Sequence, residues 1–112
     1  IEDNPIAKAA AVVILDDMQY EVTVAETAAE AIAALQHEFD IILLDLGLPD
    51  LSGIELAERI IEHNAGGATI IAVTAHASYA EQQMLKQMGV AAVLEKPFRK
   101  LQLEEVVSRD ED

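Results

Sequence analysis

The chain has no cysteine and no tryptophan, and only two tyrosines and two phenylalanines among its 112 residues. Without cysteine it has no disulfide, no thiolate metal site and no cysteine nucleophile. Basic residues are also scarce, because seven Lys and Arg stand against 21 Asp and Glu, for a formal net charge of −14. This charge disfavours direct binding to nucleic acid or to an anionic membrane, and it suits basic partners and divalent cations.

Long apolar runs are absent as well. No run approaches the ~20 residues of a membrane span, and the first residues do not have the pattern of a signal peptide. We therefore expect a cytoplasmic protein without membrane contact. The length suits one compact domain over residues 1–112. Because aromatic residues are few, Ala, Ile, Leu and Val must build the core, which is typical of helices packed on a sheet.

Apolar runs of strand length alternate with stretches of helical period. The predicted strands are Glu21–Ala25, Ile41–Leu44, Thr69–Val73 and Val90–Leu94. Helix start signals occur at Asn4-Pro5, Thr27, Ser52 and Ser78, Gly89 ends the fourth helix, and a fifth helix runs from about Arg99 to Ser108. This alternation predicts right-handed βαβ units and a parallel sheet that helices cover on both faces.

The first strand of such a sheet is largely missing from the sequence. Only Ile1-Glu2-Asp3 precede the first helix, where a doubly wound sheet requires a central strand. We expect that the natural chain carries more apolar residues before Ile1. Otherwise a strand borrowed from a neighbouring chain is the alternative.

Chemically useful residues follow the predicted strands. Asp45, Thr74 and Lys96 each come just after a strand, and Glu2 and Asp3 stand where the missing strand would end. Each of these residues also has a purely structural alternative. Asp45 caps a loop or ends a strand, Thr74 suits a strand end, Lys96 is a solvated lysine, and Glu2 and Asp3 stabilise the helix N-terminus. The carboxyl ends of parallel strands share one sheet edge, however, so we expect these side chains to converge. Clustered carboxylates repel, and a hard cation such as Mg²⁺ relieves that repulsion.

The order and spacing of these residues resemble the receiver domain of response regulators and hybrid histidine kinases. The resemblance rests on Glu2-Asp3-Asn4-Pro5, on residues 42–53, on Ile71-Ala72-Val73-Thr74-Ala75 and on Lys96-Pro97-Phe98. It implies a flavodoxin-like α/β fold with a doubly wound parallel five-stranded sheet of order 2-1-3-4-5 and five flanking helices.

The resemblance also implies roles for individual residues. Asp45 would accept a phosphoryl group, and Thr74 and Lys96 would hold its oxygens. Mg²⁺ or Mn²⁺ would be bound by Asp3, Asp45 and the backbone carbonyl of Gly47, with Glu2 acting mainly through water. The implied partner is a histidine kinase or a histidine phosphotransfer domain, and a homodimer is a further option.

One position departs from the family pattern. Val93 stands where receivers often have an aromatic switch residue, so the coupling of Thr74 to that position is changed. Aliphatic residues there resemble receivers attached to hybrid kinases. A second apolar face of the first helix (Ile6, Ala9, Val12 and Val13) is either a docking patch for the histidine-bearing partner or scattered apolar surface.

Three classes of function compete. A phosphoreceiver ranks first, as a receiver segment of a hybrid sensor histidine kinase or, second, as a stand-alone response regulator. A Mg²⁺-dependent phosphohydrolase with an aspartyl nucleophile would need an acid two residues after Asp45, where Gly47 stands. A pseudo-receiver that only binds partners ranks last, because all the chemical groups are present.

Overall fold

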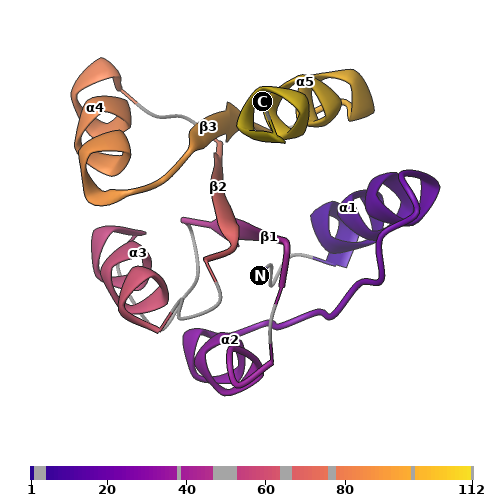
Figure 1. The fold of residues 1–112 in the computed structure, drawn as a ribbon, viewed down its shortest axis with the longest axis horizontal. Helices are drawn as coiled ribbons and strands as arrows, with labels where there is room; N and C mark the ends of the chain where they lie inside the picture. Colours follow the sequence, from indigo (N-terminus) through magenta and orange to yellow (C-terminus); the bar gives the residue numbers. More distant parts are fainter. Residues whose placement is uncertain are drawn as a thin grey trace.

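The computed structural model describes residues 1, 5–37, 39–46, 53–63, 67–75, 78–96 and 98–111. Over these residues, five helices and three strands alternate along the chain (Figure 1). The elements are α1 (Pro5–Asp17), α2 (Ala28–Ala34), β1 (Ile41–Asp45), α3 (Gly53–Glu62), β2 (Thr69–Thr74), α4 (Tyr79–Met88), β3 (Ala92–Glu95) and α5 (Lys100–Glu111). No described helix combines the length and the apolar character that a bilayer crossing requires.

Side-chain caps fix the starts of two helices. The Thr27 hydroxyl accepts a hydrogen bond from the Glu30 N–H at 3.1 Å before α2, and the Ser78 hydroxyl accepts one from the Glu81 N–H at 3.2 Å before α4. Both predicted caps are therefore confirmed. Gly89 ends α4 with a φ of 120°, which residues with a side chain rarely adopt. The Val90 N–H then donates to the Leu85 carbonyl, so β3 begins at Ala92 and not, as predicted, at Val90.

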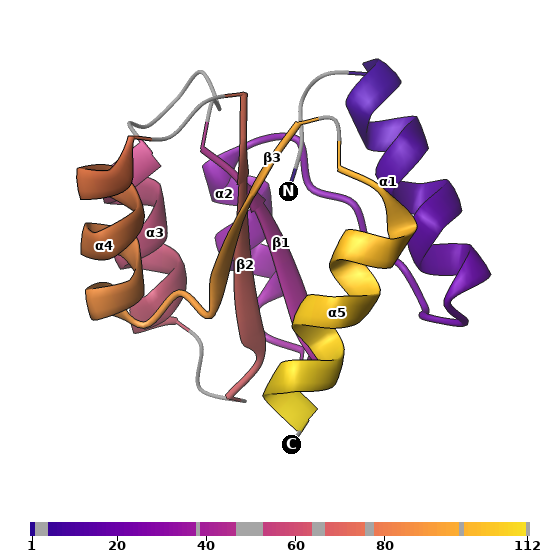
Figure 2. The same cartoon turned by 90° about the horizontal axis from the view of Figure 1, so that it is seen from above.

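The three described strands form one parallel sheet in the order β1-β2-β3. Leu43 lies opposite Ile71, and Ala72 lies opposite Val93. Helices α1 and α5 cover one face, and α2, α3 and α4 cover the other (Figures 1 and 2). The sheet is therefore the middle of three layers, as the continuous apolar run of β1 predicts.

Side chains of β1 alternate between two cores, one on each face of the sheet. On the α2–α4 face, Ile42 and Leu44 join buried residues that include Ala31, Leu56, Ile60 and Leu85. On the α1–α5 face, Ile41 and Leu43 pack against a cluster built on Ile71, Leu94, Leu103 and Val107. Both faces of β1 are thus apolar, and polar groups of this strand are left to its ends.

Ile1 lies beside β1 on the side opposite β2. Its amino group donates to the Leu43 carbonyl at 2.7 Å, and its carbonyl accepts from the Asp45 N–H at 3.0 Å. This is the bonding pattern of a parallel strand pair, in which Ile1 is the partner of Leu44. Ile1 therefore occupies the position predicted for the end of a strand next to Ile41–Leu44.

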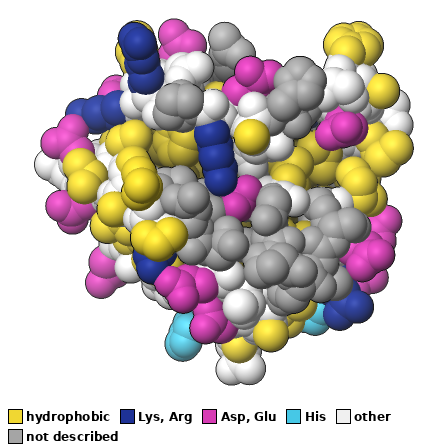
Figure 3. Space-filling view, turned by 180° about the vertical axis from the view of Figure 1, so that it is seen from behind, with side chains coloured by type: hydrophobic (Ala, Val, Ile, Leu, Met, Phe, Trp, Pro, Cys, Tyr) yellow, Lys and Arg dark blue, Asp and Glu magenta, His cyan; other side chains and the backbone are white. Residues whose placement is uncertain are grey.

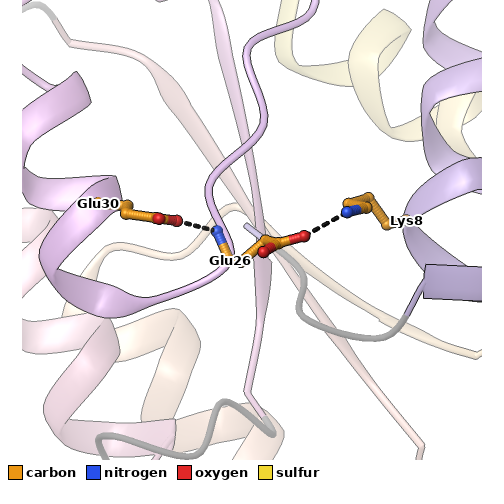
Figure 4. Close-up of polar contacts among 3 residues, drawn as sticks. All are labelled: Lys8, Glu26 and Glu30. Atoms are coloured by element: carbon orange, nitrogen blue, oxygen red, sulfur yellow. Dashed lines mark hydrogen bonds and ion pairs between the residues drawn. The ribbon is translucent and has the colours of Figure 1, made fainter.

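The predicted strand over Glu21–Ala25 is not part of the described sheet, and this segment has no regular secondary structure. A cavity separates the segment from β1, and Ile1 is the residue that pairs with the adjoining edge of β1. An ion pair between Lys8 of α1 and Glu26 holds the end of the segment, and the Glu30 carboxylate accepts from the Glu26 N–H at 2.7 Å (Figure 4). Among the described residues, no strand of the sheet pairs with this segment.

Candidate functional site

Asp45 is the last residue of β1 and lies at the carboxyl edge of the sheet. It is 6% exposed, and it is the only charged residue buried among the described part of the chain. A buried carboxylate is costly unless a partner compensates its charge. The buried carboxylate of Asp45 therefore requires a positively charged or hydrogen-bonding partner.

Lys96 follows β3 and provides that compensation. Its Nζ lies 3.2 Å from Asp45 Oδ1, and its side chain is 25% exposed against 7% for the Asp45 side chain. The Lys96 backbone N–H donates to the Thr74 carbonyl at 2.7 Å, which fixes the start of the lysine beside the end of β2. The ammonium thus lies between the buried carboxylate and the solvent.

Thr74 ends β2, the strand between β1 and β3. It is paired with Glu95, while its neighbour Val73 is paired with Asp45. The side chain of Thr74 is partly exposed. The three strand ends therefore bring Asp45 and Lys96 into contact and place Thr74 on the strand between them.

The remaining predicted site residues are Glu2, Asp3, Gly47 and Val93. Glu2, Asp3 and Gly47 lie outside the described residues, so their metal ligation stays a prediction. Val93, the residue at the switch position, lies within β3 and is partly buried. Across the described ranges, no three His, Asp or Glu residues are grouped so that they could hold a metal ion.

Two described backbone contacts flank the Asp45 carboxylate. The Asp45 N–H donates to the Ile1 carbonyl, and the Leu46 N–H donates to the Val73 carbonyl at 3.1 Å. The sequence places Ile1 at the end of the predicted first strand, and its backbone makes the contact with β1 that this position requires. Together these bonds fix the end of β1 on both sides, so the carboxylate is held on a rigid support.

The predicted ligands are chemically suited to a hard cation. Carboxylates and a backbone carbonyl supply oxygen donors, which Mg²⁺ prefers. The carboxylate of Asp45 is the member of this set that the structure describes, and it lies at a strand end with an ammonium at one oxygen. The donor chemistry of the residues present therefore fits the ion.

Charged and apolar side chains share one face of the molecule. In Figure 3, a basic side chain lies near the middle of the face next to an acidic one, and hydrophobic side chains gather on both sides. Exposed hydrophobic residues include Ile6 and Val13 of α1, which are 83% and 67% exposed. Both belong to the second apolar face of the first helix that the sequence predicts.

These features define a class of protein: a doubly wound α/β domain with an acid–lysine pair at the carboxyl ends of its strands, where such folds bind ligands. The chain belongs to the response regulator receiver domain family, which it matches over residues 1–108. The predicted family is thereby confirmed.

The chain is also similar in sequence to individual proteins of this family. It is 36% identical over 112 residues to the sensor protein GacS of Pseudomonas syringae pv. syringae, covering 96% of this chain and 12% of GacS. The chain therefore spans about an eighth of the length of this relative. The region that matches is thus one segment of a longer sensor protein.

Solved structures confirm the predicted fold class. A CheY-like receiver domain from Methanospirillum hungatei JF-1 has a TM-score of 0.84 and 31% identity, covering 97% of this chain and 87% of that one. The receiver domain of the sensor histidine kinase PA1611 from Pseudomonas aeruginosa PAO1 has a TM-score of 0.82 and 30% identity, covering 97% and 91%. That PA1611 structure has a magnesium ion coordinated in its active site cleft.

Proposed function

We propose that Asp45 accepts a phosphoryl group from a phosphohistidine partner, so that the chain acts as the phosphoacceptor of a phosphorelay. Membership of the receiver family supports the signalling role. The observation that carries the assignment to Asp45 is its buried carboxylate at the end of β1, 3.2 Å from the Lys96 ammonium. Such a pair suits phosphoryl transfer, because the ammonium balances the negative charge that the phosphoryl group brings to Asp45.

In the proposed transfer, a carboxylate oxygen of Asp45 attacks the phosphorus atom in line with the leaving group. The P–N bond to the donor imidazole breaks, and the imidazole nitrogen keeps the bonding electrons. The product is an acyl phosphate on Asp45. Phosphoryl transfer depends on positioning and on charge neutralisation, and Lys96 supplies a positive charge at the acceptor oxygen. The Thr74 hydroxyl donates to a phosphoryl oxygen.

A magnesium ion completes the proposed site. Asp3, Asp45 and the backbone carbonyl of Gly47 would hold the ion, and Glu2 would act through water. When bound, the ion withdraws negative charge from the phosphoryl oxygens. The similarity to the receiver of PA1611, which has magnesium in its cleft, supports this assignment.

The proposed response passes through Thr74. A phosphoryl group on Asp45 draws the Thr74 hydroxyl toward it and changes the chain that leads from β2 to the Ser78 cap of α4. The switch position contains Val93, so packing of an aliphatic side chain replaces the turn of an aromatic ring. We therefore propose a small displacement at β3 in place of a rotamer exchange.

The proposed context is a receiver segment of a hybrid sensor histidine kinase in the cytoplasm, with a histidine kinase or histidine phosphotransfer domain as the donor. The similarity to GacS supports it. A stand-alone response regulator is the alternative. An aspartyl phosphohydrolase is disfavoured because Gly47 stands where that chemistry needs a second acid.

Acetyl phosphate with Mg²⁺ tests the assignment directly. Intact-mass measurement of the parent chain should show one added phosphoryl group, and Asp45→Asn should show none. Asp40→Asn is the matched control, because Asp40 precedes β1 at the opposite end of the same strand. This variant should be labelled like the parent. A label that persists in Asp45→Asn would contradict the assignment.

A further inference from the structure

We propose that Phe98 is a positioning residue for the acceptor site, because its ring anchors the chain that follows Lys96 and so holds the Lys96 ammonium against the Asp45 carboxylate. Phe98 is the second residue after Lys96 and lies just before α5. It packs against the hydrophobic cluster on the α1–α5 face of the sheet. The effect of Phe98 on labelling of Asp45 rests on the proposed function, whereas its effect on the ion pair does not.

Lys96 lies at a bend between β3 and α5, and its backbone is fixed on one side by the bond from its N–H to the Thr74 carbonyl. A lysine side chain is a flexible four-carbon stem, so the position of its ammonium depends on the direction in which the backbone leaves the residue. The Asp45 carboxylate is buried at the end of β1 and cannot follow a displaced lysine. The contact therefore depends on what holds the chain after Lys96.

Phe98 is the residue that holds this part of the chain in the core. Of the described residues between β3 and α5, it is the one that packs against a hydrophobic cluster, and its neighbour Arg99 is exposed. The contacts that follow are exposed: the Arg99 N–H donates to Gln102 Oε1 at 2.7 Å, and Lys100 pairs with Asp17. Burial of an aromatic ring stabilises a position more than exposed polar contacts do.

A second anchor precedes Lys96. Leu94 of β3 is 9% exposed and belongs to the same cluster, two residues before Lys96. Leu94 and Phe98 therefore enter one core from the two sides of Lys96, and the chain has to turn between them. Removing the ring of Phe98 would leave the anchor before the turn and release the one after it. The ammonium would then no longer be held beside Asp45.

NMR of the Lys96 side chain, with ¹³C at Cε, tests this placement without any phosphoryl group. The change that Asp45→Asn causes in the Lys96 Cε and Hε shifts reports the contact between ammonium and carboxylate. We expect a clear change in the parent chain and the loss of most of it in a Phe98→Ala background. Phe98→Leu and Phe98→Val empty less of the core, so the shift change should decrease from Phe to Leu to Val even where the alanine variant does not fold.

Leu103→Ala is the matched control for damage to the core. Leu103 is fully buried in the same cluster, on α5, so its truncation should lower the unfolding temperature as well. It leaves the ring of Phe98 in place, and the Lys96 shift change should therefore persist. Gln102→Ala removes the exposed hydrogen bond to the Arg99 N–H, and the shift change should persist in this variant too.

Labelling by acetyl phosphate with Mg²⁺ tests the consequence for the reaction. Phe98→Ala should be labelled at Asp45 about tenfold more slowly than the parent, because a misplaced ammonium balances the phosphoryl charge less well. Added to Lys96→Ala, it should slow labelling no further, since its effect passes through Lys96. Leu103→Ala should be labelled at close to the parental rate.

A Lys96 shift change that survives in Phe98→Ala, or that is lost to the same extent in Leu103→Ala, would overturn the proposal. Further slowing of labelling in the Phe98→Ala/Lys96→Ala chain would do so as well, because Phe98 would then act by another route. If the parent chain takes no label while Phe98→Ala still loses the shift change, the proposed function fails and the placement of Lys96 by Phe98 stands.

Discussion

Lys96 Nζ lies 3.2 Å from Asp45 Oδ1, although Asp45 ends β1, Lys96 follows β3, and β2 lies between these two strands. The contact is possible because the Lys96 backbone N–H is bonded to the Thr74 carbonyl at the end of the intervening strand. The buried carboxylate and the more exposed ammonium therefore depend on each other. Removing either group has a consequence that can be measured.

Lys96→Ala should lower the free energy of unfolding by about 1–3 kcal/mol, because it leaves the Asp45 carboxylate buried without its ammonium. Adding Asp45→Asn to this variant should restore most of the loss, since a neutral amide needs no counter-charge. Urea unfolding of the four proteins gives the coupling energy, expected at about 0.5–3 kcal/mol. Lys86→Ala, an exposed lysine on α4, is the control and should cost less than about 0.5 kcal/mol. Equal losses for Lys96→Ala and Lys86→Ala would contradict this account.

Thr74→Ala should separate phosphoryl acceptance from the response to it. The variant retains the backbone carbonyl that binds the Lys96 N–H, so acetyl phosphate should still label Asp45. Without the hydroxyl, the NMR shift changes that labelling causes in the first turn of α4 should be lost. Thr74→Ser keeps the hydroxyl and should keep these changes. Identical shift changes in the Ala and Ser variants would exclude the hydroxyl from the response.

Local signals in the sequence predict the helices well, because a cap is made by neighbouring residues. Thr27 and Ser78 cap the helices that they were expected to begin, and Gly89 ends α4. The end of α1 has no such signal. Gln19 adopts a φ of 68°, a conformation that favours glycine, while the Tyr20 N–H bonds to the Leu15 carbonyl. Packing of Leu15 and Met18 against the core fixes this turn, and packing cannot be seen in a local pattern.

Long-range pairing limits what the sequence predicts about strands and about the site. The alternation of elements predicts that Asp45, Thr74 and Lys96 share an edge, yet the ion pair itself depends on the twist and register of three strands. The apolar pattern of Glu21–Ala25 predicts a strand, but a strand also needs a hydrogen-bonding neighbour. The sequence predicts the position of Ile1 at the end of a strand, but its hydrogen bonds to Leu43 and Asp45 are made by backbone atoms, so residue type does not identify these partners.

Leu44→Ala should destabilise the chain by about 2–5 kcal/mol, because this side chain is fully buried in the core between β1 and the α2–α4 face. Leu101→Ala makes the same chemical change on α5 at a residue that is 67% exposed, and it should cost less than about 0.5 kcal/mol. Urea unfolding measures both. Similar losses for the two variants would show that the described core does not carry the stability of the fold.

The pair of Lys100 and Asp17, which joins α5 to α1, should make stability depend on alkaline pH. A hydrogen bond from Lys100 to the Asp17 carboxylate, aided by the charges of Asp17 and Glu104 and opposed by burial, raises the pKa of Lys100 above its ordinary 10.5. The folded chain then holds this proton more tightly than the unfolded chain does. The resulting stabilisation is complete below the ordinary lysine pKa and is lost as the pH rises through the folded value.

Asp17→Asn and Lys100→Gln each remove this link, so each should unfold at a lower temperature than the parent by an amount that stays constant from neutral pH to about pH 9. Above that, the difference should shrink, because the parent loses its advantage as Lys100 deprotonates. The double variant should match Lys100→Gln, because that change already removes the contacts of Lys100 with both Asp17 and Glu104. Thermal unfolding followed by circular dichroism across this range measures the difference. A difference that persists undiminished to the highest pH would mean that the two side chains stabilise the α1–α5 contact by packing and not by the shared proton.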